Sequence, residues 1–333
     1  MGPVWPVGPG NSYGKTMLAI RVHEFGGPDV LRLEDVAQPE PGQDEILVRV
    51  MAAGVGPWDV SLRAGRLGGD LPYIPGGEFS GVVEGGTGAF ADFDDGTPVY
   101  GYAGYPSLTG CYAQYVTCPV EQLAPLPSGL DLADAGAMPI DALTAEQGLT
   151  DELDVKAGDQ VLITAAAGGL GHLAVQIARA LGAEVVATAS PKDHEFVHHL
   201  GAAVVVDHTR PDWPDQVRKA IDGGAAKVLA AAIPSLAGAA RAARDGAVIA
   251  TPVTGVGDYP DQDRVTWRQY NGLPRGPRLI RMAPWFDDGT LSPEVSHYSW
   301  RDAAEAQRVV GEGHTRGKLS LVVDDDLAAS LQL

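Results

Sequence analysis

Small residues at a fixed spacing mark the part of the chain that is best suited to bind a phosphate. Ala166, Gly168 and Gly171 follow the G-x-G-x-x-G pattern, with alanine at the first position. Such residues let the chain turn tightly, let its backbone approach a diphosphate, and let a helix pack closely on a strand. A helix that begins here would offer free N–H groups and its positive dipole end to an anion. The pattern predicts a dinucleotide site; the alternative is a tight turn in an Ala/Gly-rich chain.

The residues around this turn supply the elements that must position it. Residues 161–163 form a short apolar run, which is typical of a strand buried on both faces. Apolar residues then recur at helical spacing from Leu173 to Leu181, Gly182 ends that pattern, and residues 185–186 begin a second strand. Strand, turn, helix and strand together span about 30 residues, the length of a βαβ unit. This context favours the dinucleotide site.

The end of the second strand selects between the two nicotinamide cofactors. An NAD-specific site usually has Asp or Glu there, which binds the ribose 2′-hydroxyl. This chain has Ser190, followed by Pro191 and Lys192. A hydroxyl and an ammonium group suit a 2′-phosphate, so we predict NADPH as the cofactor. The alternative is an ordinary polar loop.

The N-terminal part of the chain has the pattern of a β-rich domain. From Met17 to about Val120, alternating strands are separated by turns rich in glycine and proline, which predicts a small, partly closed barrel. Residues 319–323 predict a last strand that returns to this barrel.

The middle of the chain alternates strands with helices. A helix interrupted by Pro139 precedes the βαβ unit, and further strands are expected at 203–207, 227–233 and 247–253. This alternation predicts an open parallel sheet with helices on both faces. Residues 255–277 are polar, show no clear period and predict a long excursion, whereas residues 302–310 predict a helix.

The predicted class is therefore α/β, with a barrel domain and a doubly wound parallel sheet. We expect a flexible N-terminal extension at 1–16, a barrel domain at 17–135 that is completed by 285–333, and a nucleotide-binding domain at 136–284.

Composition and charge disfavour several kinds of partner. A formal net charge of −19 disfavours nucleic acid and anionic membranes as partners. The 2 cysteines, Cys111 and Cys118, form no C-x-x-C pair. No apolar run approaches the roughly 20 residues that cross a bilayer, and residues 1–16 lack the apolar core of a signal peptide. We expect a cytoplasmic protein.

Several stretches resemble the zinc-independent quinone oxidoreductases of the medium-chain dehydrogenase/reductase superfamily. They include LAIRVHEFGGPDVLRLEDV, LPYIPGGEFSGVVE, AAAGGLGHLAVQIARALGAEVVATAS and HTRGKLSLVV, and the likeness covers nearly all of 17–324. The resemblance implies a GroES-like barrel, a Rossmann domain and a cleft between them. It also implies a homodimer that uses NADPH to reduce quinones or carbon–carbon double bonds next to a carbonyl.

The resemblance also implies which residues hold the cofactor. Those of the phosphate loop are Ala166, Ala167, Gly168, Gly169, Leu170 and Gly171. Ser190 and Lys192 match contacts to the 2′-phosphate, Thr144 matches a residue near the nicotinamide, and Lys318 matches a lysine near the cofactor. Asp59 and Arg63 match positions in the segment that lines the cleft.

The nicotinamide end of the expected pocket departs from the family pattern. Gly56 stands where the family usually has Asn, Val60 where an aromatic or polar residue is usual, and Asp141 where a small neutral residue is usual. The fourth strand usually ends in Asp and a Val-Gly pair, which 230–234 lack. We expect Gly56 and Val60 to widen the pocket toward a bulky, polyketide-like substrate.

The ligands of a catalytic zinc are missing from the sequence. Within the superfamily such a zinc needs a cysteine near Gly56 and a His-Glu pair, but Gly77 stands where the histidine would be and only Glu78 remains. We therefore predict a zinc-independent reaction.

The remaining chemistry is direct hydride transfer from the cofactor, which the protein assists by positioning and polarising the substrate. A donor must stabilise the enolate that forms, and a proton must follow. Tyr73, Tyr102 and Tyr105 are candidate donors, Trp58 is a candidate stacking surface, and Asp59 is a third candidate catalytic residue besides Tyr73 and Trp58. For each of them, core or rim packing is the alternative. A non-redox cyclase or lyase, and an NADPH-binding protein without catalysis, remain alternative functions.

Overall fold

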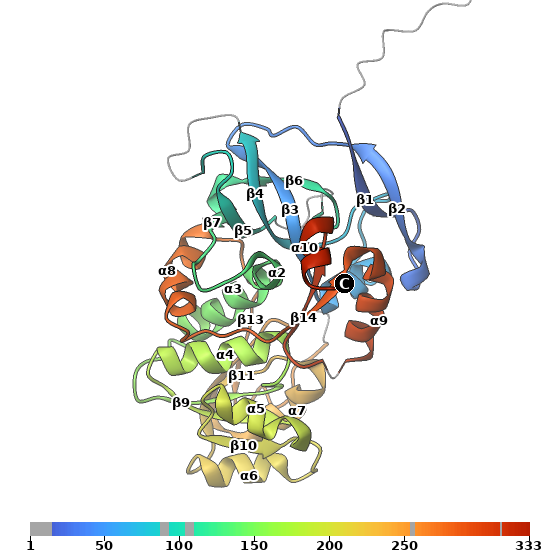
Figure 1. Cartoon of the computed structure of the whole chain (residues 1–333). Coiled ribbons are helices and arrows are strands. Elements are labelled where there is room, and N and C mark those ends of the chain that lie inside the picture. The colour runs from blue at the N-terminus through green and yellow to red at the C-terminus, as the bar shows by residue number, and fades with distance from the viewer. Residues whose placement is uncertain (1–14, 87–92, 104–109, 254–256, 314) are drawn as a thin grey trace, which may run out of the picture.

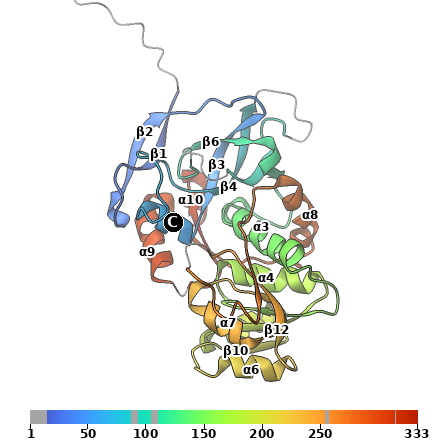
Figure 2. The same cartoon turned by 180° about the vertical axis from the view of Figure 1, so that it is seen from behind.

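The described residues form two large sheets and a two-stranded ribbon, as a computed structural model shows (Figure 1). The structure describes residues 15–86, 93–103, 110–253, 257–313 and 315–333. Helix α3 (Pro139–Gln147) lies between the two large sheets in both views (Figures 1 and 2).

Among the described residues, one large sheet has six strands in the order β10-β9-β8-β11-β12-β13, and all of its neighbours pair in parallel. This order is that of doubly wound dinucleotide-binding sheets, and it confirms the predicted fold class. The strands are β8 (Gln160–Ile163), β9 (Glu184–Ala189), β10 (Val204–Asp207), β11 (Ala225–Leu229), β12 (Ala243–Thr251) and β13 (Thr266–Gln269). Below it is called the parallel sheet.

Helices cover both faces of the parallel sheet because its strands are apolar on both sides. Val161 and Ile163 of β8 pack in one core cluster, whereas Leu162 between them packs in another. The first cluster includes residues of α3 and α4 (Gly169–Ala180), and the second includes residues of α6 (Trp213–Ala220) and α7 (Leu236–Ala242). Helix α5 (His194–His199) joins β9 to β10.

The second large sheet has seven described strands. Six of them follow the order β14-β15-β3-β4-β5-β7, and the seventh, β6, also pairs with β3. Below it is called the barrel sheet. Residue Leu319 of β15 pairs with Val55 of β3, so the C-terminal strand returns to the N-terminal part, as predicted. Its strands are β3 (Glu45–Val55), β4 (Glu78–Gly86), β5 (Pro98–Tyr102), β6 (Tyr115–Pro119), β7 (Leu123–Pro125), β14 (Val295–Ser299) and β15 (Lys318–Val322). The two-stranded ribbon is β1 (Thr16–Val22) and β2 (Leu31–Ala37).

The remaining helices mostly follow the sequence pattern. Pro139 divides the predicted helix into α2 (Leu132–Ala135) and α3, and the predicted helix at 302–310 is α9 (Ala303–Glu312). The prediction of a long excursion at 255–277 was wrong for its described part, because β13 and the start of α8 (Gly276–Asp287) lie there. Helices α1 (Pro57–Arg63) and α10 (Asp325–Ser330) complete the fold. No helix in the described parts of the chain is long and apolar enough to cross a membrane.

Candidate cofactor site and buried charge cluster

The glycine-rich turn lies between β8 and α4, at the carboxyl end of the parallel sheet. Ala165 adopts a left-handed φ of 53°, which turns the chain sharply after the strand. A Cβ atom on Gly171 would overlap the carbonyl oxygen of Ala165 and lie 2.7 Å from Cα of Ala166. Helix α4 therefore passes the turn so closely that only glycine fits at position 171. This is the packing role that the spacing predicts for its last glycine.

The middle of the turn has room for a side chain at Gly168. A Cβ atom on Gly168, the N-cap of α4, would lie 3.4 Å from the carbonyl oxygen of Ala165, its nearest neighbour among the described residues. The first turn of a helix leaves backbone N–H groups without intrahelical partners. The turn from 166 to 171 is therefore a candidate for binding a diphosphate. Leu170, in the same turn, is partly buried against the core.

A segment from the far end of the sequence lies directly on this turn. The backbone N–H of Gly317 donates to the carbonyl of Ala167 at 2.8 Å, and Gly317 forms a parallel bridge with Gly168. Because Gly317 immediately precedes β15, the barrel sheet and the phosphate loop are joined at this point.

The end of β9 holds a carboxylate that the sequence analysis missed. Ser190 Oγ donates to Asp193 at 2.6 Å, and Arg316 Nη2 binds Asp193 at 2.8 Å. Burial raises the pKa of Asp193, but the hydrogen bonds from Ser190 and Arg316 outweigh it and lower the pKa. The guanidinium of Arg316 also lies 5.0 Å from the ring centre of Phe196. Lys192 is exposed at the same turn.

One signal in the sequence would have pointed to Asp193, but none to Arg316. Asp193 follows Ser190 by three positions, which is the reach of a hydrogen bond across a short turn. Arg316 precedes Lys318 in the same R-G-K stretch. Its position on the loop became visible only with the fold.

A buried charge cluster connects the barrel sheet to α3. Lys318 Nζ lies 2.9 Å from Glu78 Oε1 and 2.7 Å from Asp141 Oδ2. The same ammonium lies 4.8 Å from the ring centre of Trp58. Glu78 also accepts the backbone N–H of Ile140 at 2.7 Å. The side chains of Lys318 and Glu78 are 2% and 0% exposed, so this cluster is largely shielded from water.

Asp59 lies beside this cluster and has an unusual charge state. Its two carboxylate oxygens accept the N–H groups of Gly56 at 2.9 Å and Gly76 at 3.2 Å. Burial, with a smaller contribution from Glu78, raises the pKa of Asp59 from 3.8 to about 7 although these hydrogen bonds oppose the shift. Burial also raises the pKa of Tyr73, and its hydroxyl has no hydrogen-bond partner among the described residues. Tyr73 therefore keeps its proton and can donate it in a hydrogen bond.

Trp58 occupies the space that the sequence analysis assigned to a widened pocket. A Cβ atom on Gly56 would overlap the Trp58 indole ring. The expectation that Gly56 widens the pocket was therefore wrong, because Trp58 folds back over the glycine and fills the volume itself. Val60 lies against α9, since its Cγ1 would be 3.5 Å from a Cβ atom on Gly311.

The other residues singled out in the sequence lie apart from the charge cluster or outside the described residues. Thr144 is buried in α3 and faces the 270–272 segment, where a Cβ atom on Gly272 would overlap its hydroxyl. Its carbonyl accepts the hydroxyl of Tyr270 at 2.9 Å. Tyr102 is partly buried against the core, and Tyr105 lies outside the described residues.

Arg63 of α1, expected in the segment that lines the cleft, is buried within the barrel part. Its Nε donates to Gln307 of α9 at 2.6 Å, and its Nη1 donates to the carbonyl of Gly26 at 2.5 Å.

Comparison with known proteins places this geometry in a family. Residues 42–128 match the alcohol dehydrogenase GroES-like domain, and residues 169–260 match the family described as zinc-binding dehydrogenase. The solved quinone oxidoreductase of Coxiella burnetii is 30% identical, with a TM-score of 0.85, and the match covers 93% of this chain and 100% of that one. The chain belongs to the quinone oxidoreductase group of the medium-chain dehydrogenase/reductase superfamily.

Two curated relatives show how much of the chain is similar in sequence to known proteins. The quinone oxidoreductase of Pongo abelii is 37% identical over 209 residues, which are 62% of this chain and 63% of that protein. The chloroplastic NADPH-dependent alkenal/one oxidoreductase of Arabidopsis thaliana is 29% identical over 92% of this chain and 80% of that protein. The first match thus spans less than two thirds of the relative's length.

The residues of this member do not fit a catalytic zinc. Within the described residues, no group of three or more His, Cys, Asp or Glu side chains is placed to hold a metal ion. Glu78, the remaining acid of the expected ligand set, binds Lys318 and the N–H of Ile140 with its two oxygens. Gly56 and Gly77 contribute no side chain.

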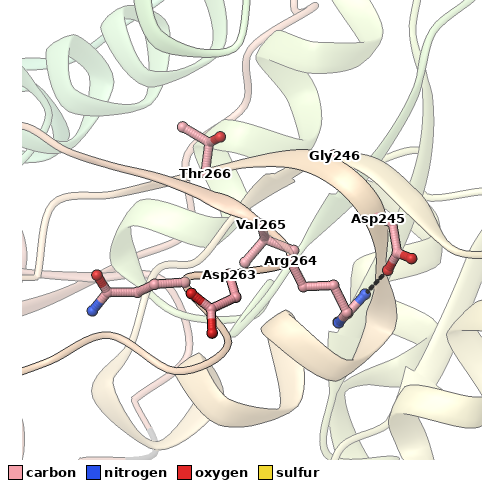
Figure 3. A pocket seen from close by; sticks show the side chains of 7 residues that line it. Asp245, Gly246, Asp263, Arg264, Val265 and Thr266 are labelled. Atoms are coloured by element: carbon pink, nitrogen blue, oxygen red, sulfur yellow. Dashed lines mark hydrogen bonds and ion pairs between the residues drawn. The ribbon is translucent and has the colours of Figure 1, made fainter.

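A surface depression elsewhere in the chain has no comparable set of buried charged groups. It is lined by Asp245, Gly246, Arg264, Val265 and Thr266, near the starts of β12 and β13 (Figure 3). Arg264 is paired with Asp245 at 2.7 Å. The starts of parallel strands lie at the edge opposite to their carboxyl ends, so this depression is remote from the phosphate loop.

The raised pKa of Asp59 predicts how stability changes with pH. In the folded protein Asp59 holds a proton up to about pH 7, whereas the unfolded chain loses it near pH 3.9. Folding is therefore stabilised at low pH, and this contribution is lost as the pH rises from about 4 to about 7, by at most about 1.4 kcal/mol per pH unit. Asp59→Asn cannot titrate, but it loses one acceptor. We expect the variant to be less stable than the wild type at pH 5, with a difference that shrinks by pH 8 in denaturant unfolding.

The exposed carboxylate of Asp222 supplies the matched control for this experiment. Asp222→Asn should give a stability profile parallel to that of the wild type between pH 5 and 8. A constant difference between Asp59→Asn and the wild type over the same range would contradict the assigned charge state.

Proposed function

We propose that this chain is an NADPH-dependent oxidoreductase that reduces a quinone, or a carbon–carbon double bond conjugated to a carbonyl, without zinc. The observation that carries the proposal is the close passage of α4 over the turn at Gly171, within a sheet of dinucleotide-binding order. The printed names of the relatives, quinone oxidoreductase and alkenal/one oxidoreductase, support the class of substrate.

The proposed cofactor site uses residues from both ends of the chain. The turn 166–171 would hold the diphosphate, while Lys192 and Arg316, close to Ser190 at the end of β9, would hold the 2′-phosphate. Thr144 in α3 stays a proposed contact for the nicotinamide half. The bound cofactor supplies a hydride from its nicotinamide ring.

The protein's own groups would orient the substrate and handle the proton. The buried phenol of Tyr73 retains its proton and has no partner among the described residues, so it can donate to a developing oxyanion. Asp59 can hold a proton near neutral pH, which suits the transfer that follows hydride addition. The indole of Trp58 offers a flat surface on which a conjugated substrate can stack. These three roles are proposals.

The size of the substrate is a separate question. Since Trp58 fills the space beside Gly56, a bulky, polyketide-like substrate would be favoured by the stacking surface of Trp58 rather than by pocket width. A homodimer, a cytoplasmic location and the domain boundaries at 135/136 and 284/285 stay predictions.

The reaction can be tested with stereospecifically deuterated NADPH and a panel of small and bulky enones and quinones. We expect one deuterium at the β-carbon of each reduced enone, in proportion to the NADPH consumed, and we expect added chelator to leave the rate unchanged. Mass analysis of the products checks this. Substrate consumption without deuterium transfer would overturn the redox proposal and favour a cyclase or lyase. NADPH binding without turnover of any substrate would instead favour a binding protein.

A further inference from the structure

A carboxylate stands against the phosphate loop where the family usually has a small neutral residue. A Cβ atom on Gly169, the first residue of α4, would lie 2.7 Å from Asp141 Oδ2 and 2.9 Å from Lys318 Cδ. Asp141 and Lys318 therefore touch the backbone of the turn that we propose binds the diphosphate. An anion in this position repels a diphosphate unless a nearby cation offsets its charge.

The cation of this cluster, the ammonium group of Lys318, already has partners. An ammonium group has three donors, and that of Lys318 faces Asp141 at 2.7 Å, Glu78 at 2.9 Å and the ring of Trp58 at 4.8 Å. With its side chain 2% exposed, the Lys318 ammonium group has little surface that a ligand could reach. Of its two carboxylate partners, Asp141 is the one with residual exposure, 10% against 0% for Glu78.

The other titratable groups nearby add no positive charge. Burial lowers the pKa of His172, in the first turn of α4, to about 4, so its ring is neutral at neutral pH. Burial raises the pKa of Asp59 and of Glu78, which removes part of their negative charge. The balance between Asp141 and Lys318 thus decides the local charge beside the turn.

We propose that Asp141 sets the affinity for the cofactor by placing a negative charge beside the diphosphate, and that Lys318 acts as a positioning residue that neutralises Asp141 without contacting the cofactor. This inference rests on the proposed function, because it assumes that the turn at 166–171 binds NADPH. It differs from the role that the family resemblance implies for Lys318, which is proximity to the cofactor itself.

A double-mutant cycle separates the two roles of Lys318. The dissociation constant of NADPH is measured by titration calorimetry for the wild type, Asp141→Asn, Lys318→Met and the double variant. We expect Asp141→Asn to bind NADPH about tenfold more tightly, since one charge close to the diphosphate is removed. Lys318→Met should bind about tenfold more weakly, because Asp141 then lacks its partner. The double variant should recover at least the wild-type affinity.

Several outcomes would overturn the inference. If Lys318 contacts the cofactor directly, the double variant will bind as weakly as Lys318→Met. Unchanged or weaker binding by Asp141→Asn overturns it as well, and this arm remains informative if Lys318→Met fails to fold, since Lys318 keeps Glu78 in the single variant. Asp222 is an exposed carboxylate at the opposite end of the parallel sheet. The variant Asp222→Asn is therefore the control for net charge and should not change the affinity for NADPH. A wild type that does not bind NADPH overturns the proposed function together with the inference, whereas the other outcomes overturn the inference alone.

Discussion

Gly171→Ala is expected to weaken NADPH binding about tenfold to a hundredfold and to lower the thermal unfolding midpoint. The added methyl would overlap the carbonyl oxygen of Ala165, which is backbone and cannot rotate away. Forcing an extra methyl into such packing costs about 1–3 kcal/mol and displaces the backbone. The displaced backbone is that of the turn itself, so the N–H groups that would face the diphosphate move with it. Titration calorimetry and thermal unfolding measure the two effects.

Gly168→Ala provides the matched comparison within the same turn. Its φ of −82° is open to any residue, and the new methyl would meet only the Ala165 carbonyl oxygen at 3.4 Å. This variant should unfold at nearly the wild-type temperature but still bind NADPH more weakly, because the methyl occupies the face that a diphosphate approaches. Wild-type affinity in Gly171→Ala would contradict the proposed diphosphate site.

The phosphate loop was predictable because every feature that forms it is local. The spacing of Ala166, Gly168 and Gly171 lies between two apolar runs within about 30 residues, so turn, helix and strands are specified together. The parallel sheet followed from the alternation of such segments, and its observed order confirms the predicted class. Whether the loop binds NADPH stays a proposal.

The charge cluster could not be predicted in the same way. Glu78, Asp141 and Lys318 lie on three elements that are far apart in the sequence, and only the closing of β15 onto β3 brings Lys318 to the other two. Asp141 was visible from the sequence only as a departure from the family pattern, without a partner. Charged residues give no periodic signal, so a pairing across such separations needs the fold.

Two errors in the sequence analysis have local physical causes. Gly56 indicated empty space, but the adjacent helix α1 directs the Trp58 ring back over it. The segment 255–277 indicated an excursion because its strand is short and mostly exposed: residues Thr266–Gln269 form β13, at the end of the parallel sheet. A polar strand with one neighbour has no alternating apolar pattern to reveal it.

Lys192→Ala is expected to weaken NADPH binding about tenfold to a hundredfold while NADH binding stays nearly unchanged. Loss of a charge-assisted contact of this kind costs about 1.5–3 kcal/mol. Binding of the 2′-phosphate should depend more on Lys192 than the sequence indicated. The reason is that Ser190 Oγ donates to Asp193 and cannot donate the same proton to a phosphate. NADH lacks the 2′-phosphate and therefore should not respond. Titration of both cofactors against the wild type and the variant measures the change in preference.

Asp193 also affects the preference between the two cofactors, because a carboxylate near the ribose normally favours NADH. Here its charge is offset by Arg316 at 2.8 Å. Arg316→Ala should therefore weaken NADPH as Lys192→Ala does, but it should also improve NADH binding, since Asp193 is then free to accept a ribose hydroxyl. Lys219 is an exposed lysine in α6, so Lys219→Ala is the control and should change neither affinity. Equal losses for the two cofactors in Lys192→Ala would show that Lys192 acts on the fold of the turn rather than on the 2′-phosphate.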